Sequence, residues 1–183
     1  MSPLLSVEHL SISFIQYDRG TSRRILPAIR DLDLTIDRGQ VAAVVGSSGS
    51  GKSLLAHGIL GILPYNAHME GTITYDGARL TPKRAAALRG REIVLVPQSV
   101  GYLDPLMKVG PQVGRDKKAV RAVLNRYGLG PETESLYPFQ LSGGMARRVL
   151  LCCALMDAPK LIIADEPTPG LDLSLAQAAL ADF

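Results

Sequence analysis

The sequence predicts an α/β protein with an antiparallel β subdomain at its N-terminus, and three patterns support this fold class. Residues 32–37 alternate apolar and polar side chains, which is typical of a strand with one face in water. Residues 41–45 are apolar throughout, as expected for a parallel strand covered on both faces. Residues 93–96 and 161–164 are short apolar runs of the same kind, which predicts a buried parallel sheet.

The rest of the N-terminal half is predicted to add two strands and a helix. Apolar residues at every second position around Ile12 indicate a first strand, and residues 72–75 alternate in the same way. Residues 53–63 suit a helix that ends before Pro64, because proline cannot continue the hydrogen-bond ladder of a helix.

The C-terminal half is predicted to be largely helical. Residues 98–142 are irregular at first and then place apolar residues on one helix face, with Gly128 as the C-terminal stop, which indicates a small helical insertion. Ser142 is a suitable N-cap for a helix that runs through Met156. A last helix is predicted from Ser174 onward.

Composition places the chain among ordinary globular proteins. It has 183 residues, of which 46% are hydrophobic and 20% charged. Its 20 basic and 17 acidic residues give a formal charge of +3, and the basic residues are scattered along the chain. Only 5% of the residues are aromatic, which leaves few side chains for base stacking. We therefore expect no nucleic-acid partner.

Membrane insertion and export are not indicated. The longest apolar run, residues 149–156, is eight residues long, whereas a membrane-spanning helix needs roughly 20. The N-terminus lacks the charged and then apolar layout of a signal peptide. Cys152 and Cys153 are adjacent inside that run, where packing is favoured over a disulfide or metal ligation, so the sequence fits a reducing, cytoplasmic setting.

A glycine-rich motif follows the predicted strand at 41–45 and precedes the predicted helix. The residues GSSGSGKS satisfy the pattern GxxxxGK[ST], whose chance occurrence in such a chain is below roughly 1%. Its backbone N–H groups can wrap a phosphate, Lys52 can neutralise phosphate oxygens and Ser53 can bind magnesium. We predict that a nucleoside triphosphate binds through Gly46, Ser47, Ser48, Gly49, Ser50, Gly51, Lys52, Ser53 and Leu54.

An acidic pair ends the predicted strand at 161–164. Asp165 is placed to supply the carboxylate that a phosphate-bound magnesium ion needs together with Ser53. Glu166 alternates to another direction and could accept a proton from an attacking water, a role worth about 10² to 10⁴ in rate. A lone Asp-Glu pair would more often be a solvated strand end, but the phosphate loop favours the functional interpretation.

A second glycine motif, Leu141-Ser142-Gly143-Gly144-Met145, lies at the start of the helix predicted to run through Met156. By itself it indicates a capped helix start or a second anion site. Together with the phosphate loop, Gln98 and the acidic pair in this order, it resembles the ATP-binding subunit of ABC transporters over nearly the whole chain. The resemblance implies a P-loop NTPase core of the RecA-like type, with ATP and Mg²⁺ as ligands.

The family resemblance also implies roles for individual residues. In that family the signature of one subunit meets the ATP held by another, so Ser142, Gly143 and Gly144 would contact the γ-phosphate across a homodimer, or a heterodimer with a sister ATPase subunit. Gln98 matches the glutamine that touches magnesium and senses the transmembrane partner. Lys52, Gln98 and Glu166 would form the catalytic set, and Ser53, Gln98 and Asp165 the metal ligands.

Two further matches are less specific. Phe14 best matches the aromatic residue that stacks on adenine, with Tyr17 as the alternative and core packing of Phe14 as the other interpretation. Asp172 matches the aspartate of the D-loop, but the residues before it depart from the commoner form of that loop. Communication between the two nucleotide sites is therefore expected to differ.

Within the family, the chain looks most like the dipeptide, oligopeptide and nickel importers, with nickel-import subunits nearest. The segments GSSGSGKSLL, GILP, YLDPLM and YPFQLSGGM carry this resemblance. It implies import of nickel, another metal chelate or a peptide through separate transmembrane subunits, with this chain peripheral on the cytoplasmic face of the cell membrane. Met145 replaces the signature glutamine, as occurs in that subgroup, so it does not by itself indicate lost activity.

The chain departs from the family at the histidine that contacts the γ-phosphate after the acidic pair. His9, His57 and His68 all precede the signature and cannot match it. A charge-assisted hydrogen bond of this kind is worth about 1.5–3 kcal/mol, so we expect slower hydrolysis with binding retained. In the family, the strand leading to this histidine lies between the strands matching 41–45 and 161–164, so we expect a truncated subunit with unpaired strand edges.

We expect a single ATP-binding domain, residues 1–183, that is incomplete at its C-terminus. Residues 1–97 would hold the β subdomain and the phosphate loop, 98–145 the Q-loop and the helical insertion, and 146–183 the signature helix and the acidic strand. The apolar residues 102–109 are a candidate contact for the transmembrane subunits, and packing beneath the helices is the other interpretation.

Two other functions stay open at this point. A module that binds ATP with little or no turnover would follow from the missing histidine. A chromosome or DNA-repair ATPase would share the signature, but such proteins carry long coiled coils or zinc modules that this sequence lacks. Hydrolysis measured with Glu166→Gln as the control, and copurification with a pair of membrane proteins, separate the three functions.

Overall fold

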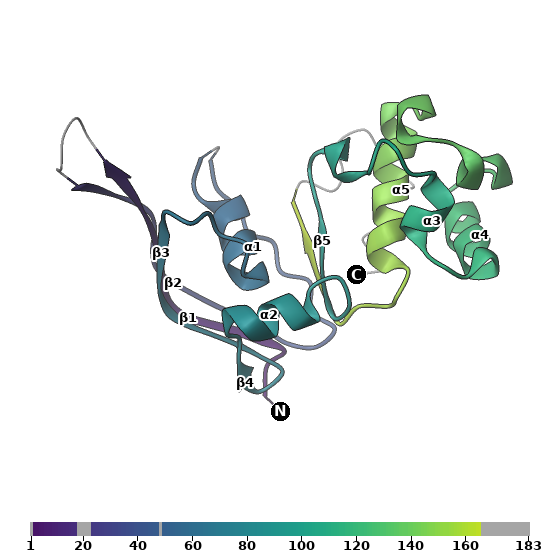
Figure 1. Cartoon of the computed structure of the whole chain (residues 1–183). Helices are drawn as coiled ribbons and strands as arrows, with labels where there is room; N and C mark the ends of the chain where they lie inside the picture. The colour runs from purple at the N-terminus through teal and green to yellow at the C-terminus, as the bar shows by residue number, and fades with distance from the viewer. Residues whose placement is uncertain (1, 18–22, 48, 166–183) are drawn as a thin grey trace. The chain divides into compact units, whose positions relative to one another are not determined.

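A computed structural model describes residues 2–17, 23–47 and 49–165 of the chain, which divides into two compact units, Met1–Arg89 and Gly90–Phe183. The first unit holds a four-stranded antiparallel sheet in the order β2-β1-β3-β4 (Figure 1), which confirms the predicted antiparallel subdomain. The strands are β1 Leu5–Tyr17, β2 Arg23–Ile36, β3 Ala67–Tyr75 and β4 Ala78–Arg79.

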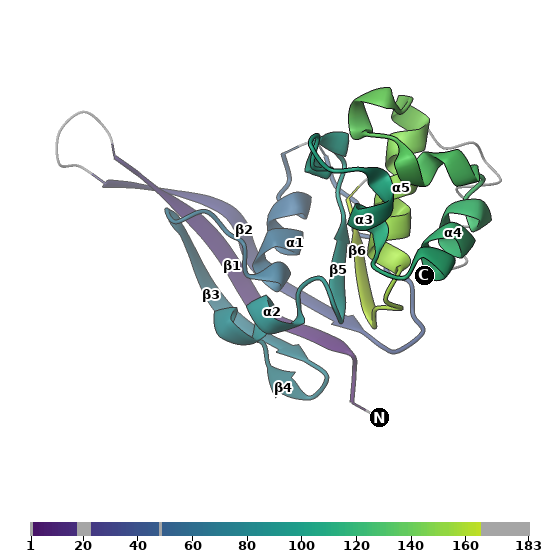
Figure 2. The ribbon, with the colours of Figure 1, turned by 45° about the vertical axis from the view of Figure 1, so that its right-hand side comes forward.

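Two helices, α1 (Lys52–Leu60) and α2 (Pro82–Leu88), lie on one face of this sheet (Figures 1 and 2). Helix α1 ends earlier than predicted, because Gly61 adopts the left-handed conformation (φ 64°) that closes a helix. Helix α2 was not predicted, although Thr81 followed by Pro82 is a helix-start signal: the Thr81 hydroxyl accepts a hydrogen bond from the Arg84 N–H at 3.3 Å.

The predicted parallel strand at residues 41–45 is wrong. Within the described part of the chain, these residues pair with no strand, and their side chains face solvent: Val41 is 64% exposed and Val45 is 91% exposed. The physical reason is that strand structure requires a hydrogen-bonding neighbour, which an apolar pattern cannot supply by itself.

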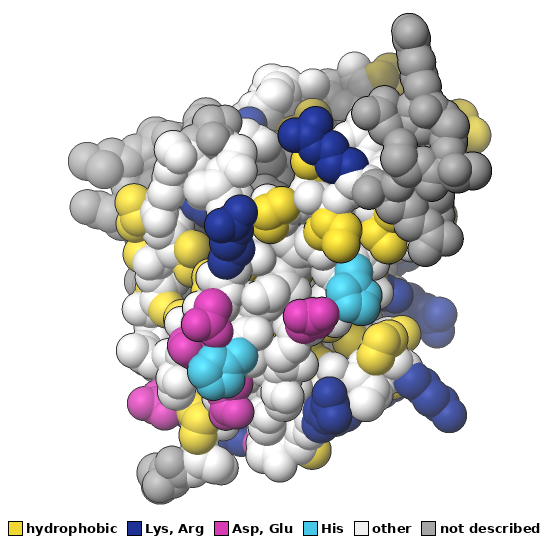
Figure 3. Space-filling view, turned by 90° about the vertical axis from the view of Figure 1, so that its left-hand side faces the viewer, with side chains coloured by type: hydrophobic (Ala, Val, Ile, Leu, Met, Phe, Trp, Pro, Cys, Tyr) yellow, Lys and Arg dark blue, Asp and Glu magenta, His cyan; other side chains and the backbone are white. Residues whose placement is uncertain are grey.

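The opposite face of the antiparallel sheet carries histidine and acidic side chains side by side (Figure 3). The His9 Nδ1 and Asp31 Oδ1 atoms lie 2.8 Å apart, and the His9 backbone N–H donates to Asp33 at 2.7 Å. Hydrogen bonding to Asp31, with the nearby charge of Asp33, raises the pKa of His9 above its ordinary value of 6.5.

The second unit contains the predicted pair of parallel strands, of which β5 is largely buried, whereas only Leu161 is buried in β6. β5 (Ile93–Val96) and β6 (Leu161–Ala164) run parallel, and both match the predicted bounds. The described helices of this unit are α3 (Val109–Val113), α4 (Lys117–Arg126) and α5 (Gly143–Leu155), with the short 3₁₀ segments η1 (Val100–Tyr102), η2 (Pro131–Ser135) and η3 (Pro138–Gln140). The domain boundaries predicted at 97/98 and 145/146 stay predictions.

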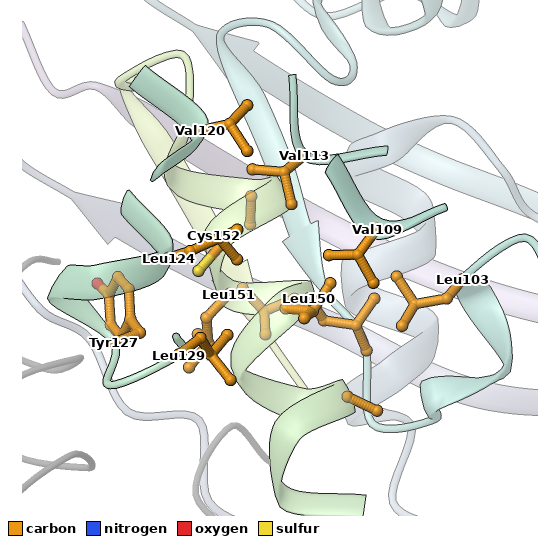
Figure 4. Close-up of a cluster of buried hydrophobic side chains, with 14 of the residues drawn as sticks. Leu103, Val109, Val113, Val120, Leu124, Tyr127, Leu129, Leu150, Leu151 and Cys152 are labelled. Carbon is orange, nitrogen blue, oxygen red and sulfur yellow. The ribbon is translucent and has the colours of Figure 1, made fainter. Parts of the chain in front are cut away.

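The core of the second unit surrounds α5 (Figure 4). Helix α4 contributes the fully buried Leu124, and Gly128 follows its last turn with φ 66°, which confirms the predicted stop. Cys152 is fully buried in this cluster, and burial raises the pKa of its thiol to about 12. The prediction that the cysteines serve packing therefore holds for Cys152. The cluster further includes Leu103, Val109, Val113, Val120, Tyr127, Leu129, Leu150 and Leu151.

Candidate functional site

The first unit carries the predicted phosphate loop, residues 46–53, directly before α1. Gly49 and Gly51 have left-handed backbone, with φ of 80° and 95°. The Ser50 N–H donates to the Ser47 carbonyl at 3.2 Å, which closes a turn inside the loop. The chain thus turns sharply into the N-terminal end of α1, where the first N–H groups have no partner inside the helix.

Two glycines in this loop lie close to neighbouring atoms. A Cβ atom on Gly46 would lie 2.5 Å from the Ser50 Oγ. A Cβ atom on Gly51 would lie 2.9 Å from the Ile29 Cγ1 and 3.2 Å from the Ala28 carbonyl oxygen. Strand β2 therefore forms a wall beside the loop. Sequence reasoning missed this wall, and no local signal marks it, because it comes from a distant strand.

The Lys52 side chain folds back over the loop. Its ammonium group donates to the Gly46 carbonyl at 2.7 Å and to the Ser47 carbonyl at 2.9 Å. An ammonium group has three donors, and these bonds use two of them. The positive charge of Lys52 is therefore held against the loop that precedes α1.

The residues of this loop fit a phosphate group. The N-terminal end of α1 carries partial positive charge and N–H groups that have no partner inside the helix, and Lys52 adds a full charge. The glycine cradle lets the backbone approach an anion closely. Ser53 lies exposed in the first turn of α1, and its hydroxyl oxygen is a ligand type that magnesium accepts.

In the second unit, Gln98 and Asp165 come to the same edge of the β5-β6 pair. Gln98 follows the end of β5, and Asp165 follows the end of β6 directly. The Asp165 N–H donates to the Val96 carbonyl at 3.0 Å, so the strand pairing continues up to the acidic residue. The carboxyl ends of parallel strands are the usual place for ligand-binding side chains. The role of Gln98 and Asp165 as metal ligands stays a prediction.

The signature turn opens α5 as predicted. The Ser142 Oγ accepts a hydrogen bond from the Met145 N–H at 3.2 Å, so Ser142 is the N-cap of this helix. Ser142 and Gly143 are exposed. Because the cap uses a lone pair of the hydroxyl oxygen, the hydroxyl hydrogen of Ser142 stays available to donate to an outside acceptor.

Phe14 lies half-buried on β1, opposite Leu26 of β2. The two strands also pair Ile12 with Ile29, the residue that contacts the phosphate loop at Gly51. Phe14 thus belongs to the strand next to the loop wall, and its role in stacking on adenine stays a prediction. Several predictions concern residues outside the described part of the chain: the roles of Ser48, Glu166 and Asp172, and the helix from Ser174. The side chain of Tyr17, the alternative residue for stacking on adenine, also lies outside it.

Comparison with known proteins identifies the family. The family model described as "ABC transporter" matches residues 29–169, which include the phosphate loop, the signature turn and the acidic pair. The chain belongs to the ABC transporter family. The predicted resemblance is therefore confirmed, and the fold is the P-loop NTPase fold of the ATP-binding cassettes.

Similar proteins of this cassette family include peptide transporters. The chain is 35% identical over 96% of its length to the oligopeptide transport ATP-binding protein OppD of Haemophilus influenzae, and spans 58% of that protein. It is 36% identical over its whole length to the dipeptide transport ATP-binding protein DppD of Bacillus subtilis, and spans 59% of it. The lipoprotein-releasing system ATP-binding protein LolD of Bordetella pertussis is 39% identical, with 93% of this chain and 75% of that protein covered.

Solved cassettes have the same fold. One ATP-binding cassette, solved as a dimer in a post-hydrolysis state bound to ADP and Pi, superimposes with a TM-score of 0.79 at 25% identity. The match covers 97% of this chain and 80% of that structure. Among the helices of the described residues, none is both long and apolar enough to cross a bilayer.

Proposed function

We propose that this chain is the ATP-binding and ATP-hydrolysing subunit of a peptide importer. The observation that carries this proposal is the phosphate loop, in which the Lys52 ammonium group lies over the Gly46 and Ser47 carbonyls at the N-terminal end of α1. Such an arrangement of a fixed cation, backbone donors and a helix end suits the β- and γ-phosphates of a nucleotide.

Other predicted site residues would bind magnesium, accept a proton and stabilise charge on the phosphate. Ser53 and Asp165 would hold magnesium, with the Gln98 amide oxygen as a further ligand. Magnesium, when bound, neutralises charge on the phosphate oxygens. Glu166 would accept a proton from the attacking water, and Lys52 would stabilise charge on the γ-phosphate.

A facing copy or a sister subunit would complete each site. The exposed turn at Ser142 presents a hydroxyl donor and the N–H groups of the first turn of α5, all of which suit a γ-phosphate held by another chain. The similarity to a dimeric cassette bound to ADP and Pi supports this arrangement. The site would then be closed only when two subunits meet around ATP.

The segment 102–109 offers a surface for transmembrane subunits. Leu103 and Val109 are buried in the core of the unit, whereas Tyr102 is 64% exposed and Leu106 is 88% exposed. The segment therefore serves packing with some residues and presents apolar side chains to solvent with others. Packing beneath the helices and contact with transmembrane subunits are both compatible with this structure. We propose the exposed residues of the segment as the contact with the transmembrane subunits.

Hydrogen bonds within this segment hold the exposed side chains in place. The Gln112 amide group donates to the Asp104 carbonyl at 3.0 Å and to the Met107 carbonyl at 2.7 Å, and its oxygen accepts from the Asp104 N–H at 2.8 Å. The Leu106 N–H donates to the Asp104 carboxylate at 2.9 Å. A loop braced in this way loses little conformational entropy when an apolar partner docks.

The names of similar proteins support the cargo class that we propose. Two of the similar proteins are named for oligopeptide and dipeptide transport, which favours a peptide over nickel or another metal chelate. The nickel alternative stays a prediction. Because the cargo passes through the transmembrane subunits, this chain would act as a peripheral protein on the cytoplasmic face of the membrane. An ATP-binding module without turnover is the second candidate, and a measurement of ATP hydrolysis separates it from the first.

Calorimetry with Mg-ATP tests the nucleotide site of the full chain. Lys52→Ala removes charge-assisted hydrogen bonds worth about 1.5–3 kcal/mol each, so nucleotide affinity should fall by about tenfold to a hundredfold. Lys83→Ala, an exposed lysine on α2, is the matched control and should bind as the native chain does. Equal affinity of the Lys52→Ala and native chains would refute the nucleotide site.

Turnover and docking require separate measurements. Phosphate release should be lost in Glu166→Gln while ATP binding is kept; binding without turnover in the native chain would establish the second candidate instead.

For docking, Leu106→Cys should crosslink to a transmembrane subunit, whereas Lys118→Cys on the exposed start of α4 should not. Because burial raises the pKa values of Cys152 and Cys153 to about 12 and about 11, these native thiols should react slowly and leave the crosslink specific.

A further inference from the structure

Arg148 connects the signature turn to the end of helix α4. Its side chain is half-buried on the second turn of α5. The guanidinium Nε donates to the Gly144 carbonyl at 3.3 Å. The Nη1 atom of the same group donates to the Gly128 carbonyl at 3.0 Å and to the Tyr127 carbonyl at 3.3 Å. One planar cation thus spans two helices.

The end of α4 needs a hydrogen-bond donor. Tyr127 and Gly128 terminate α4, where the last carbonyl groups have no partner inside the helix and the helix dipole favours a positive charge. At the other end, Gly144 is the last glycine of the signature turn. The bond to its carbonyl therefore ties the exposed turn, residues 142–144, to a buried part of the unit.

We propose that Arg148 is a positioning residue that holds the signature turn against the end of α4. The inference rests on the proposed function, because the turn acts on the nucleotide of a facing subunit. Arg148 itself touches no phosphate in this scheme. It fixes the direction in which the Ser142 hydroxyl and the first N–H groups of α5 point.

The surroundings of the guanidinium group fit this role. A Cβ atom on Gly128 would lie 3.3 Å from the Arg148 Nη1, so glycine at this position leaves room for the guanidinium group. Lysine at position 148 would keep the charge but carries its donors on a single nitrogen, so it could not reproduce the fork that reaches both helices. The neighbouring Arg147 makes no hydrogen bond that the structure records among the described residues, which makes it the matched control.

Hydrogen exchange tests the positioning without any nucleotide chemistry. In the full chain, Arg148→Ala should make the amides at the start of α5 exchange about tenfold faster, with the amides of β5 and β6 unchanged. Arg147→Ala should leave both sets at native rates. Native exchange at the start of α5 in Arg148→Ala would overturn the proposal, and so would faster exchange throughout the unit, which would mean general destabilisation.

Hydrolysis in mixed dimers tests the consequence for function. Pairing an Arg148→Ala chain with a Lys52→Ala chain leaves one site with an intact phosphate loop and an intact signature, and this dimer should keep about half of the native rate, each site contributing independently. Placing both substitutions in one chain, with a native partner, leaves no intact site, and the rate should fall at least about tenfold. Equal rates for the two dimers would overturn the role of Arg148 in positioning. No hydrolysis by the native chain would refute the proposed function instead, and hydrogen exchange would still decide on Arg148.

Discussion

Replacing Gly51 with alanine should destabilise the first unit. The loss should be larger than at a glycine of the phosphate loop where the added methyl group contacts no other atom. Gly51 has φ 95°, and the left-handed region costs a residue with a Cβ atom about 1–2 kcal/mol. The new Cβ would lie 2.9 Å from the Ile29 Cγ1, and overpacking of this kind costs about 1–3 kcal/mol. The free energy of unfolding should therefore fall by about 2–5 kcal/mol in total.

Gly49 provides the matched control for this experiment. It has φ 80°, but a Cβ atom there would meet no atom within 4 Å. Gly49→Ala should therefore lose only the backbone part, about 1–2 kcal/mol. Urea unfolding of the full chain, followed by circular dichroism, measures both values.

A double-mutant cycle then isolates the contact with β2. In an Ile29→Ala background, the contact with the Ile29 Cγ1 is gone while the Ala28 carbonyl oxygen remains, so the cost of Gly51→Ala should fall part of the way towards that of Gly49→Ala. If Gly51→Ala costs no more than Gly49→Ala, β2 does not form a wall beside the loop. If the Ile29→Ala background leaves the cost of Gly51→Ala unchanged, the Ile29 side chain does not contribute to this wall.

Two titrations should report on the described side chains. The pKa of His9, followed by NMR, should lie above 6.5 and fall towards it in Asp31→Asn; the stability that this pair contributes is present below pH 6.5 and lost as the pH rises through the raised pKa. An ordinary His9 pKa in the native chain would contradict the pairing. The Cys152 thiol, with a pKa of about 12 against 9.0 for a free thiol, should make stability fall as the pH rises from 9 towards 12, and Cys152→Ala should reduce this slope. The same slope in both chains would show that Cys152 ionises freely.

The parts of the fold that sequence reasoning predicted are those that neighbouring residues determine. Ser142 caps α5 because its own side chain reaches the Met145 N–H, and Gly128 ends α4 because glycine accepts the left-handed conformation. The two parallel strands, β5 and β6, were also predicted, since a short run of apolar residues bounded by turn residues is typical of such a strand.

The features that escaped prediction depend on residues far apart in the chain. Residues 41–45 carry the same apolar pattern as β5, yet they form no strand in the described part of the chain, because pairing depends on a neighbour and not on the pattern. The bonds from Arg148 to the end of α4 join positions about twenty residues apart, and no spacing rule anticipates them. In the phosphate loop, the motif gave the residues, but the wall beside Gly51 comes from β2.

The bonds from Lys52 to the Gly46 and Ser47 carbonyls have a consequence for mutagenesis of this loop. The ammonium group acts as an internal brace, so its removal changes the shape of the loop together with its electrostatics. Weaker nucleotide affinity after Lys52→Ala would combine both losses, and a free cation added to the solution could restore the charge but not the brace.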